Sequence, residues 1–253
     1  LIYYPGVMFG LFKKKKEETT AAVAIDYSSL GVDMHSHLLP GIDDGSPDAA
    51  TSVGYIKKMM ELGYRKFITT PHIYPDLYPN SSETILAAYQ VLTTKLKEEA
   101  VDVEVTAAAE YFIDDLFADR LKNDEPLLTF HQNFVLVEIS FMQAPSDLKK
   151  ILFDLIVKGY QPVLAHPERY NYYHSLKEVY HRFKDQGVLL QVNLLSLSGY
   201  YGKGVQDAAH YLVEHKLVDL IGTDLHHQRH LEAMQHPQLM ADVKRAVETN
   251  HLL

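Results

Sequence analysis

The apolar positions of the chain gather into seven short runs, and each run is followed by a stretch with helical spacing. Such nearly continuous runs are typical of strands that are buried on both faces of a parallel sheet. We predict strands at residues 31–34, 65–70, 101–109, 134–137, 162–165, 188–192 and 218–223. The alternation of strand and helix over residues 31–253 predicts one α/β domain with parallel strands.

Helix boundaries are indicated by capping residues. Ser46, which precedes a proline, predicts the start of a helix that ends at Gly63, because serine caps a first turn and proline fits its first position. Ser81 or Ser82 should cap a long helix that reaches about residue 99. Further helices are expected at residues 114–122, 146–159, 176–186, 205–216 and 237–250.

Charge and cysteine content exclude several classes of protein. The formal net charge is −9, with 33 acidic and 24 basic residues, which disfavours a nucleic-acid binder because phosphate contacts need a basic face. The chain has no cysteine, which excludes disulfides, thiolate metal ligands and a cysteine nucleophile. This composition fits a cytoplasmic protein that binds no nucleic acid.

The first 30 residues differ from the rest. An apolar stretch over residues 1–12 precedes four lysines at 13–16, which is the reverse of the order in a signal peptide. The stretch is also too short to span a bilayer. We therefore expect residues 1–30 to be a mobile N-terminal extension, and residues 31–253 to be a single catalytic domain. Membrane contact is expected to be only indirect, or through this tail and its lysines.

Six of the seven predicted strands end in a histidine, aspartate or glutamate. The carboxyl ends of parallel strands lie on the same side of the sheet, where such folds place their active sites. His35 and His37 are two positions apart, so they can face the same way. Side by side, the candidate ligands are His35, His37, Asp43, His72, Glu110, Glu138, His166, Asp224 and His226.

Each of these residues alone could cap a loop or form a salt bridge. Together they would place several acids and imidazoles at one end of a buried sheet, where unpaired charge is costly. Divalent cations offset that cost, and imidazole with carboxylate is the ligand set of zinc, manganese or iron. The sequence therefore predicts a multinuclear metal centre.

The motifs that carry these residues resemble the PHP (polymerase and histidinol phosphatase) superfamily. More closely, they resemble the bacterial tyrosine-protein phosphatases of capsular and exopolysaccharide gene clusters, over essentially residues 31–253. The motifs are Asp33-Met34-His35-Ser36-His37, Ile42-Asp43-Asp44-Gly45, Thr70-Pro71-His72, Ala109-Glu110, Val137-Glu138 and Ala165-His166-Pro167-Glu168-Arg169-Tyr170. The resemblance implies a distorted seven-stranded (β/α)7 barrel of the PHP type.

The resemblance also implies three divalent ions, typically manganese, with iron or zinc as alternatives. The first ion would be held by His35, His37, Glu110 and Asp224. The second would be held by Glu110 as a bridging ligand, with Glu138 and His166. The third would be held by Asp43, His72 and His226. One departure concerns residues 223–229, because the family usually has a small residue and an asparagine after the last histidine.

The expected reaction is hydrolysis of phosphotyrosine on a protein, and the resemblance implies the tail of an autophosphorylating bacterial tyrosine kinase that controls polysaccharide export. Clustered cations supply hydroxide at neutral pH, so we expect in-line attack by a metal-bridging hydroxide without a covalent intermediate. Arg169 and Arg229 each follow a candidate ligand by three residues and are candidates to bind the phosphate, with a rim salt bridge as the alternative. Asp44 or His227 is the candidate proton donor to the leaving group.

Seven tyrosines in the expected loops on the active side either form walls for an aromatic substrate or pack the rim. They are Tyr74, Tyr78, Tyr170, Tyr172, Tyr173, Tyr200 and Tyr201.

Three other functions share the predicted metal centre. A histidinol-phosphate phosphatase would differ only in its substrate pocket. A metal-dependent exonuclease is disfavoured by the acidic chain, which has no basic tract beyond the lysines at 13–16. A non-catalytic metal-binding regulatory module is the alternative of another class, although such modules usually lack a ligand and none is missing here.

Overall fold

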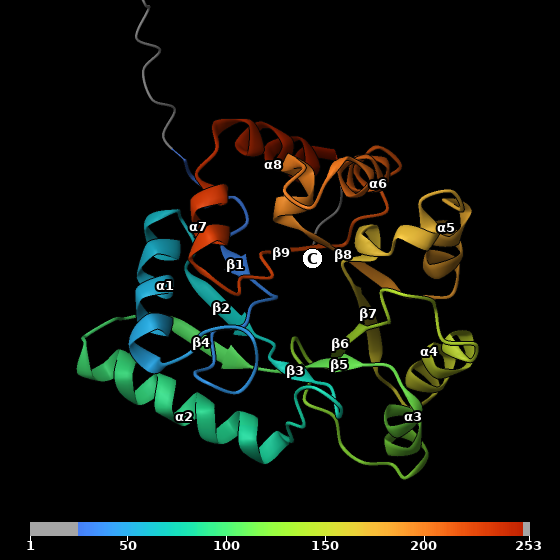
Figure 1. The fold of residues 1–253 in the computed structure, drawn as a ribbon, viewed down its shortest axis with the longest axis horizontal. Helices are drawn as coiled ribbons and strands as arrows, with labels where there is room; N and C mark the ends of the chain where they lie inside the picture. Colours follow the sequence, from blue (N-terminus) through green and yellow to red (C-terminus); the bar gives the residue numbers. More distant parts are fainter. Residues whose placement is uncertain (1–24, 250–253) are drawn as a thin grey trace, which may run out of the picture.

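Residues 25–249, the part of the chain that this computed structural model describes, fold into parallel strands flanked by helices (Figure 1). The strands pair into two sheets. The first has the order β1-β2-β4 and consists of β1 (Val32–Asp33), β2 (Lys66–Thr69) and β4 (Glu104–Ala107). The second has the order β3-β5-β6-β7-β8-β9 and consists of β3 (His72–Ile73), β5 (Glu110–Phe112), β6 (Phe134–Glu138), β7 (Gln161–Ala165), β8 (Leu189–Asn193) and β9 (Leu220–Gly222).

The described residues form nine strands, two more than predicted. The additional strands are β3 and β5, which begin just beyond the predicted strand ends at residues 70 and 109. β2 stops before Pro71 and resumes as β3, because proline has no N–H to donate to the ladder. β4 likewise stops and resumes as β5. In the segments that link the two sheets, the neighbouring chains stay joined by single hydrogen bonds, from Ala108 N to Thr69 O (2.9 Å) and from Glu110 N to Pro71 O (3.0 Å).

The opposite edges of the two sheets also meet only locally. Ser36 and Leu225 form an isolated parallel bridge, and the His37 amide donates to Leu225 O over 3.0 Å. The parallel α/β architecture predicted from the sequence is therefore confirmed. The seven-stranded closed barrel is not: within residues 25–249 the ladders end at these two junctions, and the pairing leaves two sheets.

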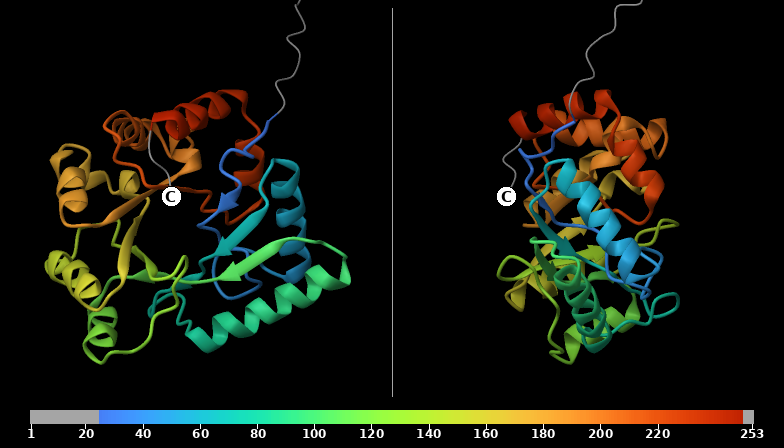
Figure 2. Two further views of the ribbon diagram at one scale, coloured as in Figure 1. Left: turned by 180° about the vertical axis from the view of Figure 1, so that it is seen from behind. Right: turned by 90° about the vertical axis from the view of Figure 1, so that its left-hand side faces the viewer.

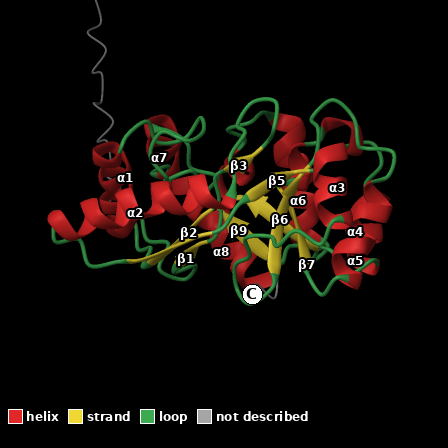
Figure 3. Ribbon diagram, turned by 90° about the horizontal axis from the view of Figure 1, so that it is seen from below, coloured by secondary structure: helices red, strands yellow, loops and turns green. Residues whose placement is uncertain are grey.

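Eight α-helices in the described residues lie outside the strands (Figures 1 and 2). They are α1 (Ala49–Glu61), α2 (Ser82–Glu98), α3 (Asp115–Lys122), α4 (Leu148–Val157), α5 (Glu178–Asp185), α6 (Lys203–Glu214), α7 (Gln228–Met234) and α8 (Pro237–Thr249). Figure 3 shows the strands between two groups of helices, with α1, α2 and α7 on one side and α3, α4 and α5 on the other. The short helix α7 was not predicted.

The predicted capping residue is confirmed for one helix and wrong for another. Ser81 caps α2 and forms a capping box with Thr84, as predicted. α1 is capped by Asp48, whose side chain accepts a hydrogen bond from the Thr51 amide, and not by Ser46. Ser46 is fully buried, and its hydroxyl accepts a hydrogen bond from the Ser52 hydroxyl over 2.9 Å. A carboxylate therefore caps the positive end of α1.

The packed chain begins before residue 31. Tyr27 is fully buried, and its hydroxyl donates to the Met234 carbonyl oxygen over 2.6 Å. Residues 25–30 therefore pack on the domain, which differs from the expected mobile extension. The rest of that extension, with its apolar stretch and lysines, lies outside the described residues. No helix within residues 25–249 is long and apolar enough to cross a membrane.

Candidate metal centre

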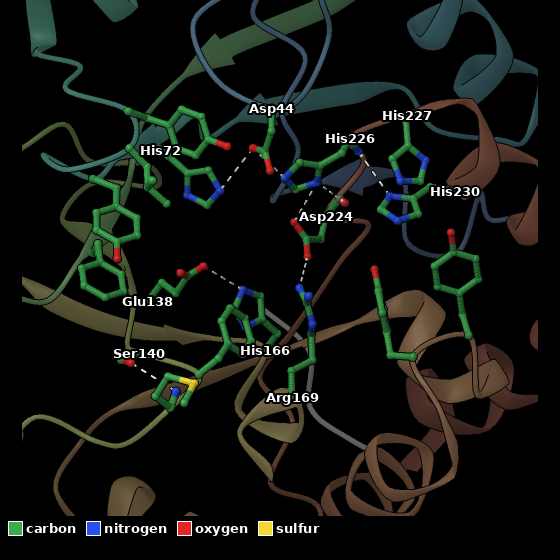
Figure 4. Close-up of a pocket in the computed structure, with 18 residues that line it drawn as sticks. Asp44, His72, Glu138, Ser140, His166, Arg169, Asp224, His226, His227 and His230 are labelled. Atoms are coloured by element: carbon green, nitrogen blue, oxygen red, sulfur yellow. Dashed lines mark hydrogen bonds and ion pairs between the residues drawn. The ribbon is translucent and has the colours of Figure 1, made fainter. Parts of the chain in front are cut away.

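The strand ends bring the predicted ligands together, and His72, Glu138, His166, Asp224 and His226 line one pocket. His72 and Glu110 begin β3 and β5, Glu138 ends β6, His166 follows β7, and Asp224 and His226 follow β9. Figure 4 shows several of these side chains pointing toward one another from different strands. The pocket has a volume of about 620 Å³. The parallel topology thus collects residues that are far apart in the sequence.

Four groups of nitrogen and oxygen atoms are close enough to hold a cation. Within each group the ligand atoms lie within 4.8 Å of one another. Glu110 belongs to two groups, as do His35, His37 and His72, and of these four it alone has two carboxylate oxygens with which to bridge two ions. The groups are His37, Asp44, His72 and His226; His35, His37 and Asp224; His35, Glu110 and His166; and His72, Glu110 and Glu138. They include every predicted ligand except Asp43.

Asp43 and Asp44 face different partners. One oxygen of Asp43 (Oδ2) accepts hydrogen bonds from His37 Nδ1 (2.8 Å) and the His72 amide (3.1 Å), and the other accepts from the Gly45 amide (3.0 Å). The Asp43 carboxylate therefore supports His37 from behind. Asp44 Oδ1 lies 3.6 Å from His72 Nε2 and 3.4 Å from His226 Nε2. The structure thus brings Asp44 to the place where the sequence predicted Asp43.

The centre of the cluster is Glu110, which is fully buried. Its Oε2 lies 3.1 Å from His35 Nε2, 3.4 Å from His37 Nε2 and 3.3 Å from His72 Nδ1. Burial alone would raise the pKa of Glu110, but the charges of His35 and His72 hold it well below its usual range. This carboxylate is therefore ionised and available to a cation.

The imidazoles show the complementary effect. Burial would lower the pKa of His166, but its hydrogen bonds to Glu110 and Glu138 raise that pKa to about 10. Without cations His166 therefore holds a proton where an ion would lie, whereas burial and the charge of His37 lower the pKa of His72.

The donor set fits divalent metal ions. His72 Nδ1 is buried and makes no hydrogen bond with the described residues, although it faces Glu110 and belongs to a candidate group with Glu138. All the candidate ligand atoms are imidazole nitrogens and carboxylate oxygens, which suit manganese, iron and zinc.

Comparisons with known proteins agree with this geometry. The family model described as "Capsular polysaccharide synthesis, CpsB/CapC" matches residues 31–250. The chain belongs to the CpsB/CapC family. Membership confirms the capsule-cluster family that the strand-end motifs predicted.

Relatives of this CpsB/CapC chain carry phosphatase names. The tyrosine-protein phosphatase YwqE of Bacillus subtilis is 29% identical over 77% of this chain and 77% of its own length. The tyrosine-protein phosphatase CpsB of Streptococcus agalactiae is 23% identical over 77% of this chain and 82% of its own.

Solved structures give the same picture. One chain comes from the crystal structures of YwqE from Bacillus subtilis and CpsB from Streptococcus pneumoniae, described as metal-dependent tyrosine phosphatases. It matches with a TM-score of 0.73 and 25% identity, over 88% of this chain and 96% of its own. A zinc-bound amidohydrolase from Burkhoderia ambifaria matches with a TM-score of 0.50 and 12% identity, over 92% of this chain and 88% of its own, which indicates a shared fold.

The two candidate phosphate-binding arginines of this CpsB/CapC chain lie in different surroundings. Arg169 lines the pocket, and its Nη1 donates to Asp224 Oδ2 over 2.8 Å. Its guanidinium carbon lies 5.0 Å from the ring centre of Phe141 and 4.5 Å from that of Tyr201. Arg229 is exposed on α7 and does not line the pocket. Only Arg169 is therefore placed to contact a substrate there.

The tyrosines divide between the two predicted roles. The side chain of Tyr170 is buried, and its hydroxyl donates to the Ala165 carbonyl oxygen over 3.1 Å. It therefore packs inside the domain and does not line the pocket. Four tyrosines line the pocket instead: Tyr74, Tyr78, Tyr200 and Tyr201. Tyr78 stacks on His72 with ring centres 5.3 Å apart and nearly parallel planes. The pocket therefore combines polar candidate ligands with aromatic walls.

Sequence reasoning missed two polar residues behind the ligands. Gln191 and Asn193 lie fully buried on β8 and contact His35 and Asp224 respectively. The available signal was a glutamine within an otherwise apolar strand, with an asparagine two positions later on the same face.

Proposed function

We propose that this chain is a metal-dependent protein-tyrosine phosphatase that removes phosphate from the phosphotyrosine-bearing tail of a bacterial tyrosine kinase. The observation that carries the proposal is the ligand cluster inside an aromatic-walled pocket. The phosphatase names of the CpsB/CapC relatives support the reaction. We place the protein in the cytoplasm, where a kinase tail would meet it. We also infer that the two sheets together correspond to the distorted barrel of the family.

We propose three divalent ions, with manganese as the first to test and iron or zinc as alternatives. The first ion is assigned to His35, His37, Glu110 and Asp224, and the second to Glu110, Glu138 and His166. For the third ion we assign Asp44, His72 and His226, with Asp43 as a support of His37. Divalent cations lower the pKa of a bound water and offset charge on phosphoryl oxygens.

The residues of the chain position the substrate. Arg169 binds the phosphate with a planar, permanently charged guanidinium, held in place by Asp224 and by the rings of Phe141 and Tyr201. The aromatic walls contact the tyrosine ring. A phenolate leaves more readily than an alkoxide, since the tyrosine pKa is about 10, so little help from a proton donor is needed. Asp44 then serves as a ligand and not as a proton donor.

A steady-state assay tests the function. Full-length protein loaded with manganese is expected to hydrolyse a phosphotyrosine peptide, to lose this activity on chelation and to regain it when manganese is returned. Histidinol phosphate and a phosphoserine peptide are assayed as alternative substrates under the same conditions. A higher kcat/KM for histidinol phosphate would favour the other phosphatase of the superfamily. Tight binding of a phosphotyrosine peptide without turnover would favour a regulatory module.

A further inference from the structure

A chain of side-chain amides on β8 links two candidate ligands from different strands. Gln191 Oε1 lies 2.8 Å from His35 Nδ1, and it also accepts a hydrogen bond from the His166 amide over 3.3 Å. Gln191 Nε2 donates to Asn193 Oδ1 over 3.0 Å, and Asn193 Nδ2 donates to Asp224 Oδ2 over 2.6 Å. The chain therefore runs in one direction, from His35 through two amides to Asp224.

The direction of the chain decides the protonation of His35. An amide oxygen only accepts hydrogen bonds, so the proton of a neutral His35 is held on Nδ1, facing Gln191. The lone pair of Nε2 then faces the cluster, where Nε2 lies 3.1 Å from Glu110 Oε2 and 3.5 Å from Asp224 Oδ1. His35 is thus held in the form that can bind a cation.

The same chain divides the two oxygens of Asp224. Oδ2 accepts hydrogen bonds from Asn193 and from Arg169 Nη1 (2.8 Å). Oδ1 faces the imidazoles of His35, His37 and His226 at 3.5, 3.5 and 3.3 Å. One oxygen is therefore bound by amide and guanidinium donors, and the other is directed toward the cluster.

We propose that Gln191 and Asn193 are positioning residues of the metal centre, which fix the tautomer of His35 and reserve one oxygen of Asp224 for the cations. The inference rests on the proposed metal-dependent function. β8 lies between β7 and β9, so one strand holds groups from both neighbours, as well as His35 beyond β1. Partners behind metal ligands typically change metal affinity or activity ~10–100-fold when they are removed.

The test compares variants that keep side-chain volume but remove the amides. Gln191→Met and Asn193→Leu are expected to bind Mn²⁺ ~10–100-fold more weakly than the wild type, measured by calorimetry on metal-free full-length protein. Gln161→Met is the matched control. Gln161 begins β7, at the end of the strand away from His166, and its side chain donates to the Gly187 carbonyl oxygen. Its Mn²⁺ affinity is expected to equal that of the wild type.

Kinetics and stability separate positioning from simple packing. At saturating Mn²⁺, kcat of the two variants should return to within a few-fold of the wild type, while the Mn²⁺ concentration for half-activation stays ~10–100-fold higher. If Asn193→Leu does not fold, Asn193→Ser is used, which is too short to reach both Gln191 and Asp224 and should show the same loss.

Folded variants with wild-type Mn²⁺ affinity would overturn the inference. If the metal-free variants also had a lower melting temperature, the amides would be assigned to the packing of the sheet alone. If the wild type itself binds no Mn²⁺, the proposed function fails before this question arises, so the two failures are distinguishable.

Discussion

Substitution of Gly222 by alanine tests how closely the site depends on the contact between β9 and the residues after β1. A Cβ at position 222 would lie 2.6 Å from His35 Cβ and 3.0 Å from Gln191 Nε2. Carbon atoms pack at about 3.5–4.0 Å, so His35 and Gly222 must separate by about 1 Å. Two hydrogen bonds join these segments at His35, from the Asp224 amide (2.7 Å) and from the Thr223 hydroxyl (3.3 Å), and both reach the His35 carbonyl oxygen, so the strain moves the ligands themselves.

The expected effect of Gly222→Ala is a loss of ~10²-fold in kcat/KM for a phosphotyrosine peptide, since a displacement of about 1 Å at a reacting centre typically costs that much. Overpacking should also lower the free energy of unfolding by about 1–3 kcal/mol. The assays are steady-state kinetics at saturating Mn²⁺ and chemical denaturation.

Gly54→Ala in α1 is the matched control, because a Cβ there meets no atom within 4 Å. It should leave kcat/KM unchanged and raise the free energy of unfolding by about 0.5–1 kcal/mol, as alanine replaces glycine inside a helix. If Gly222→Ala retains wild-type kcat/KM and Mn²⁺ affinity, the reasoning from close packing of His35 is refuted.

Three further predictions concern the ligands and the arginines. Asp44→Ala should hold one ion fewer per chain in elemental analysis, whereas Asp43→Ala should reach the wild-type number but bind Mn²⁺ ~10–100-fold more weakly; equal ion numbers in both variants would contradict the assignment. Arg169→Met should lose ~10²-fold in kcat/KM, and the exposed Arg229→Met should stay within about twofold; similar losses in both would contradict the placement. Because the pKa of His166 is about 10 without ions, binding must displace its proton, so Mn²⁺ affinity should rise with pH between 6 and 9, by about tenfold per pH unit for each proton released; a pH-independent affinity in calorimetry would contradict the protonated network.

The parallel strands and the gathering of acids and imidazoles at their ends were predictable from the chain itself. Buried parallel strands leave long apolar runs, and residues after such runs must lie at one end of the sheet. That rule placed Glu110, Glu138 and His166 without any knowledge of contacts. The two sheets were not predictable, because β3 and β5, which pair at one edge of the second sheet, are only two and three residues long and leave no apolar run of their own.

The sequence also did not show which of two adjacent aspartates faces the cluster. Asp43 and Asp44 occupy a turn, where no periodicity tells which carboxylate faces inward. Hydrogen bonds from His37, Gly45 and the His72 amide decide it, and they exist only after folding. The position of Arg229 was not predictable for a similar reason, since the unpredicted helix α7 carries it to an exposed place outside the pocket lining.

Anomalous diffraction at the manganese absorption edge, on crystals of the full-length protein grown with Mn²⁺, tests the central claim most directly. The account predicts peaks among the side chains of Asp44, His72, Glu110, His166 and Asp224, with one ion beside Asp44 and another beside Glu138. A pocket without anomalous density at saturating Mn²⁺, or ions bound elsewhere on the surface, would contradict it.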